Sequence, residues 1–444
     1  MFGLPWDQAL GAMMFIGMIV FLFAGFPVAF SLTFTGLVFG LVGFGLPFFH
    51  LLPLRIWGTM TNFTLLAVPL FVFMGVALEK SGLAEELLET MALLFGRLRG
   101  GIAISVVVVG AILAASTGIV GASVITMGLV SLPTMLRRGY DKQLITGTIC
   151  ASGTLGQILP PSVILILLGD IMGVSVGDLY IGAVIPGLVL VGLYIVYLFI
   201  LAQWKPELAP PVPAAEVAAF QAQALKRVSI ALLPALILIV GVLGSIFAGI
   251  ASPTEAASVG AAGGLLLTVA KGRFSMEMLR NVMRTPTRIT SLAFIILIGA
   301  NTFGLVFRGL NGDHLVQNLL LNLPFGPYGV LAVVMSVIFF LGFFIDFFEI
   351  CFIHVPILTP VLVTHFGFDP VWLAVVLGVN LQTSFLTPPF GFALFYLRGV
   401  APPEITTGDI YRGVIPFIGL QLIGLTMIIA FPDTVFSLIR FFRS

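Results

Sequence analysis

The sequence is poor in charged residues: Asp, Glu, Lys and Arg together make up 9% of its 444 residues. A soluble protein has roughly 25% charged residues, so a chain with this few cannot cover the surface of a soluble domain. Hydrophobic residues make up 59% of the chain, and the mean hydropathy is +1.18. The formal net charge is only +1, which argues against nucleic acid as a partner, because that binding needs clustered positive charge. The composition therefore indicates a polytopic membrane protein.

Cysteine is equally scarce. Cys150 and Cys351 both lie in apolar runs without CxxC spacing, which excludes a disulfide framework and favours buried thiols over a metal site. The HExxH, GxSxG and Walker A motifs are also missing, and the four histidines are scattered. We therefore expect a transporter and not an enzyme, with no organic cofactor and no use of ATP, driven by an ion gradient.

Long apolar runs are abundant, and at about 20 residues per crossing they leave room for ten or more spans. A polar, proline-rich segment over 204–228 separates two halves that repeat at an offset of ~226–228, since Phe26-Pro27 matches Ser252-Pro253 and Pro160-Pro161 matches Pro388-Pro389. Sixteen of the 20 basic residues fall in loops that one topology places in the cytoplasm. That topology has both termini outside and the second half upside down relative to the first, as in many secondary transporters. The basic residues outside this set are Arg55, Arg308, Arg440 and Arg443.

The fold class that we predict is an all-α polytopic membrane protein of two inverted repeats, each with scaffold helices, a re-entrant helical hairpin and a broken helix. The first repeat is expected over 1–203, with scaffold 1–99, hairpin and broken helix 100–178, and a helix over 179–203. Residues 204–228 form a cytoplasmic linker. The second repeat is expected over 229–444, with scaffold 229–325, hairpin and broken helix 328–400, and a helix over 411–432.

Two matching Pro-Pro pairs, Pro160-Pro161 and Pro388-Pro389, interrupt apolar runs, and a helix cannot continue through such a pair. Interruptions at corresponding places in two halves are a pointer to a transporter's binding site. The freed carbonyls can replace the hydration shell of Na+, and small residues at the hairpin tips allow the backbones to approach. The candidate Na+ ligands in the first half are Gly156, Leu159 and Pro160 with Thr117 or Thr154; in the second they are Asp346, Ser384, Phe385 and Thr387. Kinks satisfied by neighbouring helices are the alternative reading.

Asp346 and Glu349 stand three residues apart in an apolar run and share one helix face. A carboxylate inside a membrane is costly and usually functional, so Asp346 is a candidate ion ligand and Glu349 a candidate proton carrier or substrate ligand. A pair that caps a broken helix is the alternative. Arg398 follows the second broken helix and is the candidate partner of an anionic substrate; an arginine that extends to the membrane interface is equally consistent.

Five motifs extend across nearly the whole chain: Phe26-Pro27-Val28-Ala29, Ser252-Pro253-Thr254-Glu255-Ala256, Arg138-Gly139-Tyr140, Gly153 through Ser162, and Asn380 through Gly391. In these motifs the sequence resembles the large membrane subunit (DctM-like) of tripartite ATP-independent periplasmic (TRAP) transporters. The resemblance implies an elevator-type Na+ symporter of the bacterial inner membrane. It also implies a small four-helix membrane subunit (DctQ-like) and a periplasmic binding protein (DctP-like) that delivers an organic acid.

By the same resemblance the Na+ sites fall on Thr117, Val120, Gly156, Leu159 and Pro160, and on Gly342, Ser384 and Thr387. The chain departs from the family at the first tip, where Thr117-Gly118-Ile119-Val120 replaces Ser-Gly-Ser-Ser, and at Ser384, where glycine is common. The candidates for substrate contact besides Arg398 are Glu349, Gln157, Thr154 and Asn380. Two other readings stay open: a Na+/anion symporter that needs no binding protein, and a membrane scaffold subunit without transport.

Overall fold

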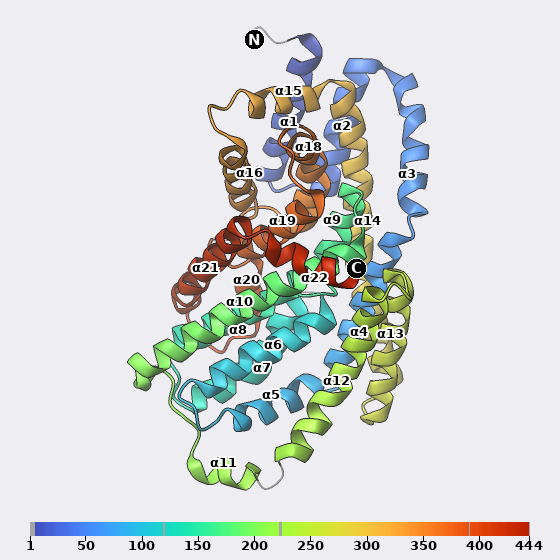
Figure 1. Ribbon diagram of the computed structural model, residues 1–444. Coiled ribbons are helices and arrows are strands. Elements are labelled where there is room, and N and C mark those ends of the chain that lie inside the picture. The colour runs from blue at the N-terminus through green and yellow to red at the C-terminus, as the bar shows by residue number, and fades with distance from the viewer. Residues whose placement is uncertain (1–4, 119, 222–223, 390, 444) are drawn as a thin grey trace.

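The computed structural model describes residues 5–118, 120–221, 224–389 and 391–443, which fold into helices without a β-strand among them (Figure 1). In the first half the α-helices are α1 (Trp6–Phe23), α2 (Val28–Phe44), α3 (Leu52–Met60), α4 (Ala67–Lys80), α5 (Leu83–Leu94), α6 (Gly101–Thr117), α7 (Val120–Arg137), α8 (Lys142–Thr154), α9 (Val163–Met172) and α10 (Val176–Trp204). In the rest of the chain they are α11 (Ala214–Gln221), α12 (Ala224–Phe247), α13 (Pro253–Ala270), α14 (Met276–Gly309), α15 (Gly312–Leu321), α16 (Pro327–Leu341), α17 (Phe347–Glu349), α18 (Val355–Pro360), α19 (Pro370–Ser384), α20 (Phe392–Val400), α21 (Thr407–Ala430) and α22 (Asp433–Arg443). The predicted all-α class is confirmed.

Seven of the described helices are long and apolar enough to cross a membrane, or eight if the bent pair around α3 and α4 counts as one span. Shorter apolar helices of 10–17 residues make up the difference from the expected ten or more spans, and they include α6, α9, α16 and α19. Of these four, α6 and α16 are arms of the two hairpins, and α9 and α19 are halves of the two broken helices. An apolar run in this chain is therefore often only part of a membrane crossing.

The packing of the two halves is reciprocal. α1 packs on α2 as α12 packs on α13, and α4 packs on α13 as α14 packs on α2. Deeper in the molecule, α8 packs on α21 as α19 packs on α10, and α7 packs on α20 as α18 packs on α9. Two copies of one unit that pack against each other through equivalent helices produce this pattern, which supports the predicted repeat. The opposed orientation of the copies across the membrane stays a prediction.

Three segments differ from the expected layout. The predicted linker 204–228 is partly helical, and the guanidinium of Arg138 holds α11 through an ion pair with Glu216. This ion pair lowers the pKa of the Glu216 carboxyl. In the segment 271–288 the spacing of the basic residues predicts a separate interfacial helix, but most of the segment belongs to the continuous helix α14, which contains Pro286.

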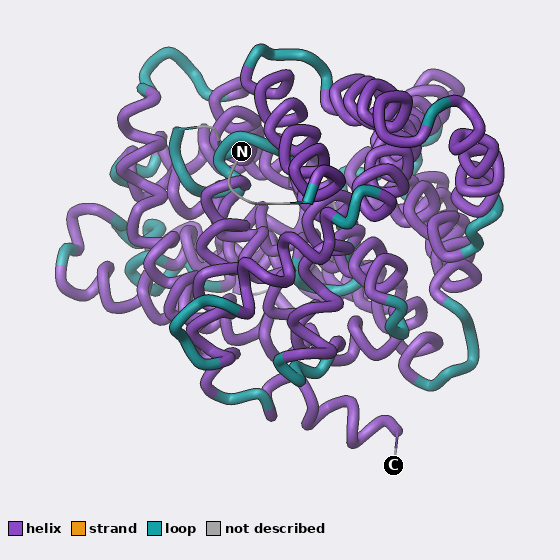
Figure 2. Tube along the Cα trace, turned by 90° about the horizontal axis from the view of Figure 1, so that it is seen from above, coloured by secondary structure: helices purple, strands orange, loops and turns teal. Residues whose placement is uncertain are grey.

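The third difference is α22, which extends beyond the predicted last helix and lies at the edge of the molecule against α10 (Figure 2). Arg440 pairs with Asp433, and Arg443 pairs with Asp178 at the start of α10 at 2.8 Å. These acidic partners neutralise the two C-terminal arginines that do not fit the charge rule.

Candidate functional site

The first break interrupts the helix that starts as α8. The chain leaves α8 at Thr154, makes one 3₁₀ turn, passes through a cis Pro160-Pro161 bond and resumes as α9. Ser162 caps α9: its hydroxyl donates to the Gln157 carbonyl and accepts from the Leu165 N–H. Every residue from 151 to 169 is buried, so the polar groups of this break lie inside the protein.

The tip of the first hairpin rests on this break. Gly118 ends α6 with φ +61°, and a Cβ added to it would lie 2.7 Å from the carbonyl oxygen of Pro161. The predicted contact between tip and break is therefore present, with Val120 buried at the start of α7. The side chain of Thr117 lies outside the described part of the structure.

Three carbonyls of the first break have no donor. No N–H or hydroxyl in the described part of the chain donates to the oxygens of Gly156, Leu159 or Pro160. Buried carbonyls in proteins nearly always have a partner, and unwound backbone carbonyls are typical Na+ ligands in transporters. These three predicted ligands are therefore available to a cation. The described residues contain no group of three or more His, Cys, Asp or Glu side chains fit for a metal ion.

The second break repeats the arrangement with other chemistry. α19 ends at Ser384, a cis Pro388-Pro389 bond follows, and α20 starts at Phe392. A Cβ added to Gly342 at the second tip would lie 2.3 Å from the Ser384 hydroxyl oxygen, so this tip also meets its break. The hydroxyls of Ser384 and Thr387 donate within their own helical segment, to Leu381 at 2.7 Å and Thr383 at 2.9 Å.

Asp346 and Glu349 form a capping box at the second tip. The Asp346 carboxylate accepts from the Phe347 N–H at 2.7 Å, and the Glu349 carboxylate accepts from the Asp346 N–H at 3.0 Å. The helix that they start becomes a π-helix over Ile350–His354, a distortion that is frequent at functional sites. The capping alternative thus describes the observed bonds, which leave the ion-ligand role of Asp346 untested.

The residues predicted to contact substrate do not share one cavity. The Thr154 hydroxyl accepts from Gln421 at 3.5 Å, and the Asn380 amide donates to the Met335 carbonyl of α16 at 2.9 Å. The amide of Gln157 is buried without a partner among the described residues. Glu349 is engaged at the second tip, and Arg398 is exposed with its guanidinium on the Ile405 carbonyl.

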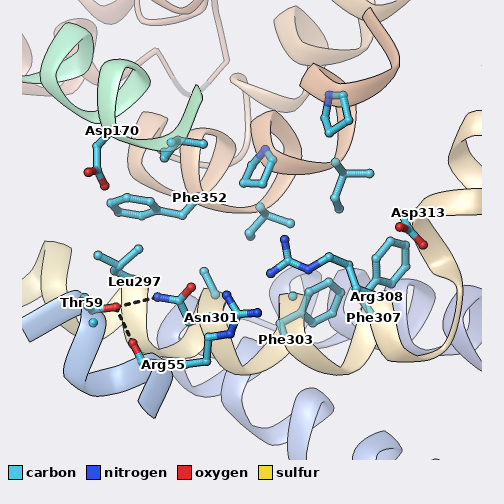
Figure 3. A pocket seen from close by; sticks show the side chains of 18 of the residues that line it. Arg55, Thr59, Asp170, Leu297, Asn301, Phe303, Phe307, Arg308, Asp313 and Phe352 are labelled. Carbon is cyan, nitrogen blue, oxygen red and sulfur yellow. Dashed lines mark hydrogen bonds between the residues drawn. The ribbon is translucent and has the colours of Figure 1, made fainter. Parts of the chain in front are cut away.

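A cavity of about 610 Å³ lies elsewhere (Figure 3). It is bounded by scaffold helices α3 and α14 and by the part of the second hairpin that follows its tip, which includes α18. Arg55 of α3 and Arg308 of α14 project into it, and Asp170 at the end of α9 lies across from them. The Asn62 amide donates to Asp170 at 2.6 Å, and the Asn301 amide donates to the Thr59 hydroxyl at 2.8 Å.

Arg55 and Arg308 are not among the site residues that the sequence motifs predict. The signal was nonetheless present, because they are two of the four basic residues that the cytoplasmic loops do not account for. An arginine placed against the charge rule needs an anionic partner or a function. Neither guanidinium has a hydrogen-bond or ion-pair partner within the described ranges, whereas the other two have acidic partners.

Comparison with known proteins supports a transport role for this architecture. A family model described as "Tripartite ATP-independent periplasmic transporter, DctM component" matches residues 15–434. The chain is 29% identical over 382 residues to the C4-dicarboxylate TRAP transporter large permease protein DctM of Pseudomonas aeruginosa, covering 86% of this chain and 87% of that protein. It is 28% identical over 418 residues to the sialic acid TRAP transporter large permease protein SiaM of Vibrio cholerae, covering 94% and 95%.

A third relative is the ectoine/5-hydroxyectoine TRAP transporter large permease protein UehC of Ruegeria pomeroyi, 28% identical over 428 residues, with 96% of this chain and 97% of that protein covered. Among solved structures, the YdaH transporter of Alcanivorax borkumensis superimposes with a TM-score of 0.63 at 16% identity, over 97% of this chain and 100% of that chain. The YdaH similarity shows the fold alone.

Proposed function

Since the chain belongs to the DctM family of TRAP transporter large permeases, we propose that it is the permease subunit of a Na+-coupled symporter that imports an organic acid. The family is one of secondary transporters, so the chain is not an enzyme. With at least seven apolar helices among the described residues, it is a multi-pass protein of the bacterial inner membrane.

Na+ coupling is supported by one observation above the others: each hairpin tip meets the Pro-Pro break of its own half. Gly118 closes on Pro161, and Gly342 closes on Ser384. Near the first contact the carbonyls of Gly156, Leu159 and Pro160, which accept no hydrogen bond from the described residues, offer oxygens to a cation. A coupling ion bound there ties hairpin and broken helix together, so that they move as one unit.

An elevator mechanism is our proposal for that movement. The two hairpins and two broken helices pack on one another and on α10 and α21, while α2, α4, α13 and α14 pack together as a second group that contacts the first through α4 and α14. The first group is the candidate mobile domain and the second the candidate scaffold. The cavity lies where these groups meet, so movement of one along the other exposes it to either side in turn.

The partners are also proposed. The family is tripartite by name, so we expect a small four-helix membrane subunit on the scaffold and a periplasmic binding protein that delivers the acid. C4-dicarboxylate, sialic acid and ectoine are the cargoes that the names of the three relatives give. They share a carboxylate, which supports an organic acid as substrate here. The alternative is a Na+/anion symporter that works without a binding protein. We expect such a symporter to take up its substrate when the binding protein is absent, which distinguishes it from a TRAP permease.

The test is uptake into proteoliposomes that contain the chain and its small subunit. The binding protein is first screened by thermal shift against organic acids, and the acid that stabilises it is used as labelled substrate. We expect uptake to depend on an inward Na+ gradient and on the binding protein. Equal uptake with an inward K+ gradient at the same ionic strength would contradict Na+ coupling, and no uptake under any gradient would favour a scaffold subunit.

A further inference from the structure

The cavity beside α14 has a charge distribution that selects among organic acids. Arg55 and Arg308 reach into it from the scaffold, and neither guanidinium forms a hydrogen bond or an ion pair in the described part of the molecule. A guanidinium offers a planar fork of donors that matches a carboxylate. Two unpaired forks at the edge of a membrane domain therefore create a site for one anionic group.

Acidic residues lie on both sides of this pair. Asp170 lies toward one end of the cavity and Asp313 toward the other, with the arginines between them (Figure 3). The formal charges of these four lining residues cancel, so one added carboxylate is attracted by the adjacent arginines. A second carboxylate that extends toward either end of the cavity approaches an aspartate and is repelled, because like charges a few ångströms apart interact unfavourably.

One side of the remaining wall is apolar, while polar side chains line other parts of the cavity: Thr59, Asn62, Asn301, Gln317, Thr364 and His365. Phe352, Ile353, Pro356 and Ile357 line the cavity from the second hairpin arm, and Phe303 lines it from α14. We infer that the cavity binds a monocarboxylate with an apolar body, whose carboxylate is held jointly by Arg55 and Arg308. The inference rests on the proposed transport function and names its substrate class. Because the arginines belong to the scaffold and most of the named apolar residues to the hairpin, a bound acid bridges the two groups of helices.

The test uses three probes that share one skeleton: 3-phenylpropanoate, its neutral amide, and the dicarboxylate 3-(4-carboxyphenyl)propanoate. The measurement is the unfolding temperature of the purified full chain titrated with each probe. We expect the monocarboxylate to raise this temperature, the dicarboxylate to raise it less, and the amide to leave it unchanged. Equal shifts for acid and amide, a larger shift for the dicarboxylate, or no shift with either acid would overturn the inference.

Substitutions locate the site. Arg55→Gln and Arg308→Gln should each weaken the apparent affinity for 3-phenylpropanoate by about tenfold or more, since each removes charge-assisted hydrogen bonds. Arg280→Gln is the matched control, because Arg280 is exposed on the same helix outside the cavity. Unchanged affinity in both cavity variants would also overturn the assignment.

A Na+ titration without any acid distinguishes a failure of the monocarboxylate site from a failure of the proposed Na+ coupling. Stabilisation by Na+ over K+ reports on the tips and breaks, which contain neither arginine. A chain that responds to Na+ but to no acid retains Na+ coupling and loses the monocarboxylate site. A chain that responds to the acid but not to Na+ retains the site and loses the coupling.

Discussion

The two Pro-Pro breaks have the same position in the two halves but satisfy their polar groups differently. At the first break every residue is buried, and three carbonyls accept no hydrogen bond from the described residues. At the second, Thr387 and Pro388 are half-buried and Pro389 is exposed, and the Thr387 carbonyl accepts from the Gly391 N–H at 3.0 Å. The polar groups of the first break therefore depend on a ligand or on close packing. The polar groups of the second break largely form hydrogen bonds within the break itself.

The two hairpin tips also differ, because only the second has ionisable side chains. The first tip, Thr117-Gly118-Ile119-Val120, has no ionisable side chain, whereas the second has Asp346 and Glu349. If both breaks bind Na+, the first does so with backbone oxygens at close range and the second with help from a carboxylate. The duplication thus conserves the geometry of the contact, and the chemistry of the two contacts has diverged.

The largest effect is expected from Gly118→Ala. The alanine must adopt a positive φ, which costs about 1–2 kcal/mol, and its Cβ would lie 2.7 Å from the Pro161 oxygen. The tip must then withdraw from the break. We expect Na+-driven uptake to fall by at least about tenfold, because a backbone contact cannot relax as a side chain does.

Gly139→Ala is the matched control for Gly118→Ala. Gly139 follows the same hairpin and has φ +76°, but an added Cβ there meets nothing within 4 Å. The control therefore contains the backbone strain without the collision. Equal losses in the two variants would show that strain, and not the contact with the break, limits transport.

Gly342→Ala at the second tip is expected to have a smaller effect on uptake, which a second substitution at Ser384 should reverse. Gly342→Ala places a Cβ 2.3 Å from the Ser384 oxygen and 2.4 Å from its Cβ, and uptake should fall severalfold as the tip shifts. Ser384→Gly in the same chain removes both atoms and should restore uptake to near the level of Ser384→Gly alone. A double variant as weak as Gly342→Ala would mean that the collision is not the cause, which a double-mutant cycle measures directly.

The breaks and the tips were predictable because they depend on local chemistry. Paired prolines end a helix wherever they occur, and glycine at Gly118 and Gly342 allows each tip to approach its break closely. The sequence also placed Asp346 and Glu349 on one face, but their role as a capping box became visible only when the start of the helix at Phe347 was known. The continuous course of α14 was missed because its basic half and its apolar half have different patterns.

The cavity could not be predicted, because its two arginines are separated by most of the chain and are assembled only by packing. Arg55 lies in segment 53–63, whose pattern predicts an interfacial helix, and Arg308 lies one residue before the end of α14. Arg398 seemed the better candidate since it follows a broken helix in sequence, yet its side chain is directed to the Ile405 carbonyl. The contact of α3 with α14 joins the two arginines, and no local pattern records it.

Asp346→Asn separates capping from ion binding at the second tip. Asparagine is as good a helix cap as aspartate, so a purely structural Asp346 tolerates the change. If the carboxylate is a Na+ ligand, the Na+ concentration for half-maximal uptake should rise by about tenfold, the effect of losing one charge-assisted contact. An unchanged Na+ dependence with unchanged stability would leave Asp346 as a cap, and the two breaks would then differ less than we propose.

Thr387→Ala is expected to have the smallest effect. The Thr387 hydroxyl donates to the Thr383 carbonyl at 2.9 Å, which leaves its oxygen lone pairs available to a cation. Its loss removes a contact worth about 1 kcal/mol, so the Na+ concentration for half-maximal uptake should rise a few-fold while the maximal rate stays the same. Thr387→Ser retains the hydroxyl and should retain the Na+ dependence. If serine and alanine behave alike at this position, the hydroxyl is not a ligand, and the second break binds Na+ through other oxygens or not at all.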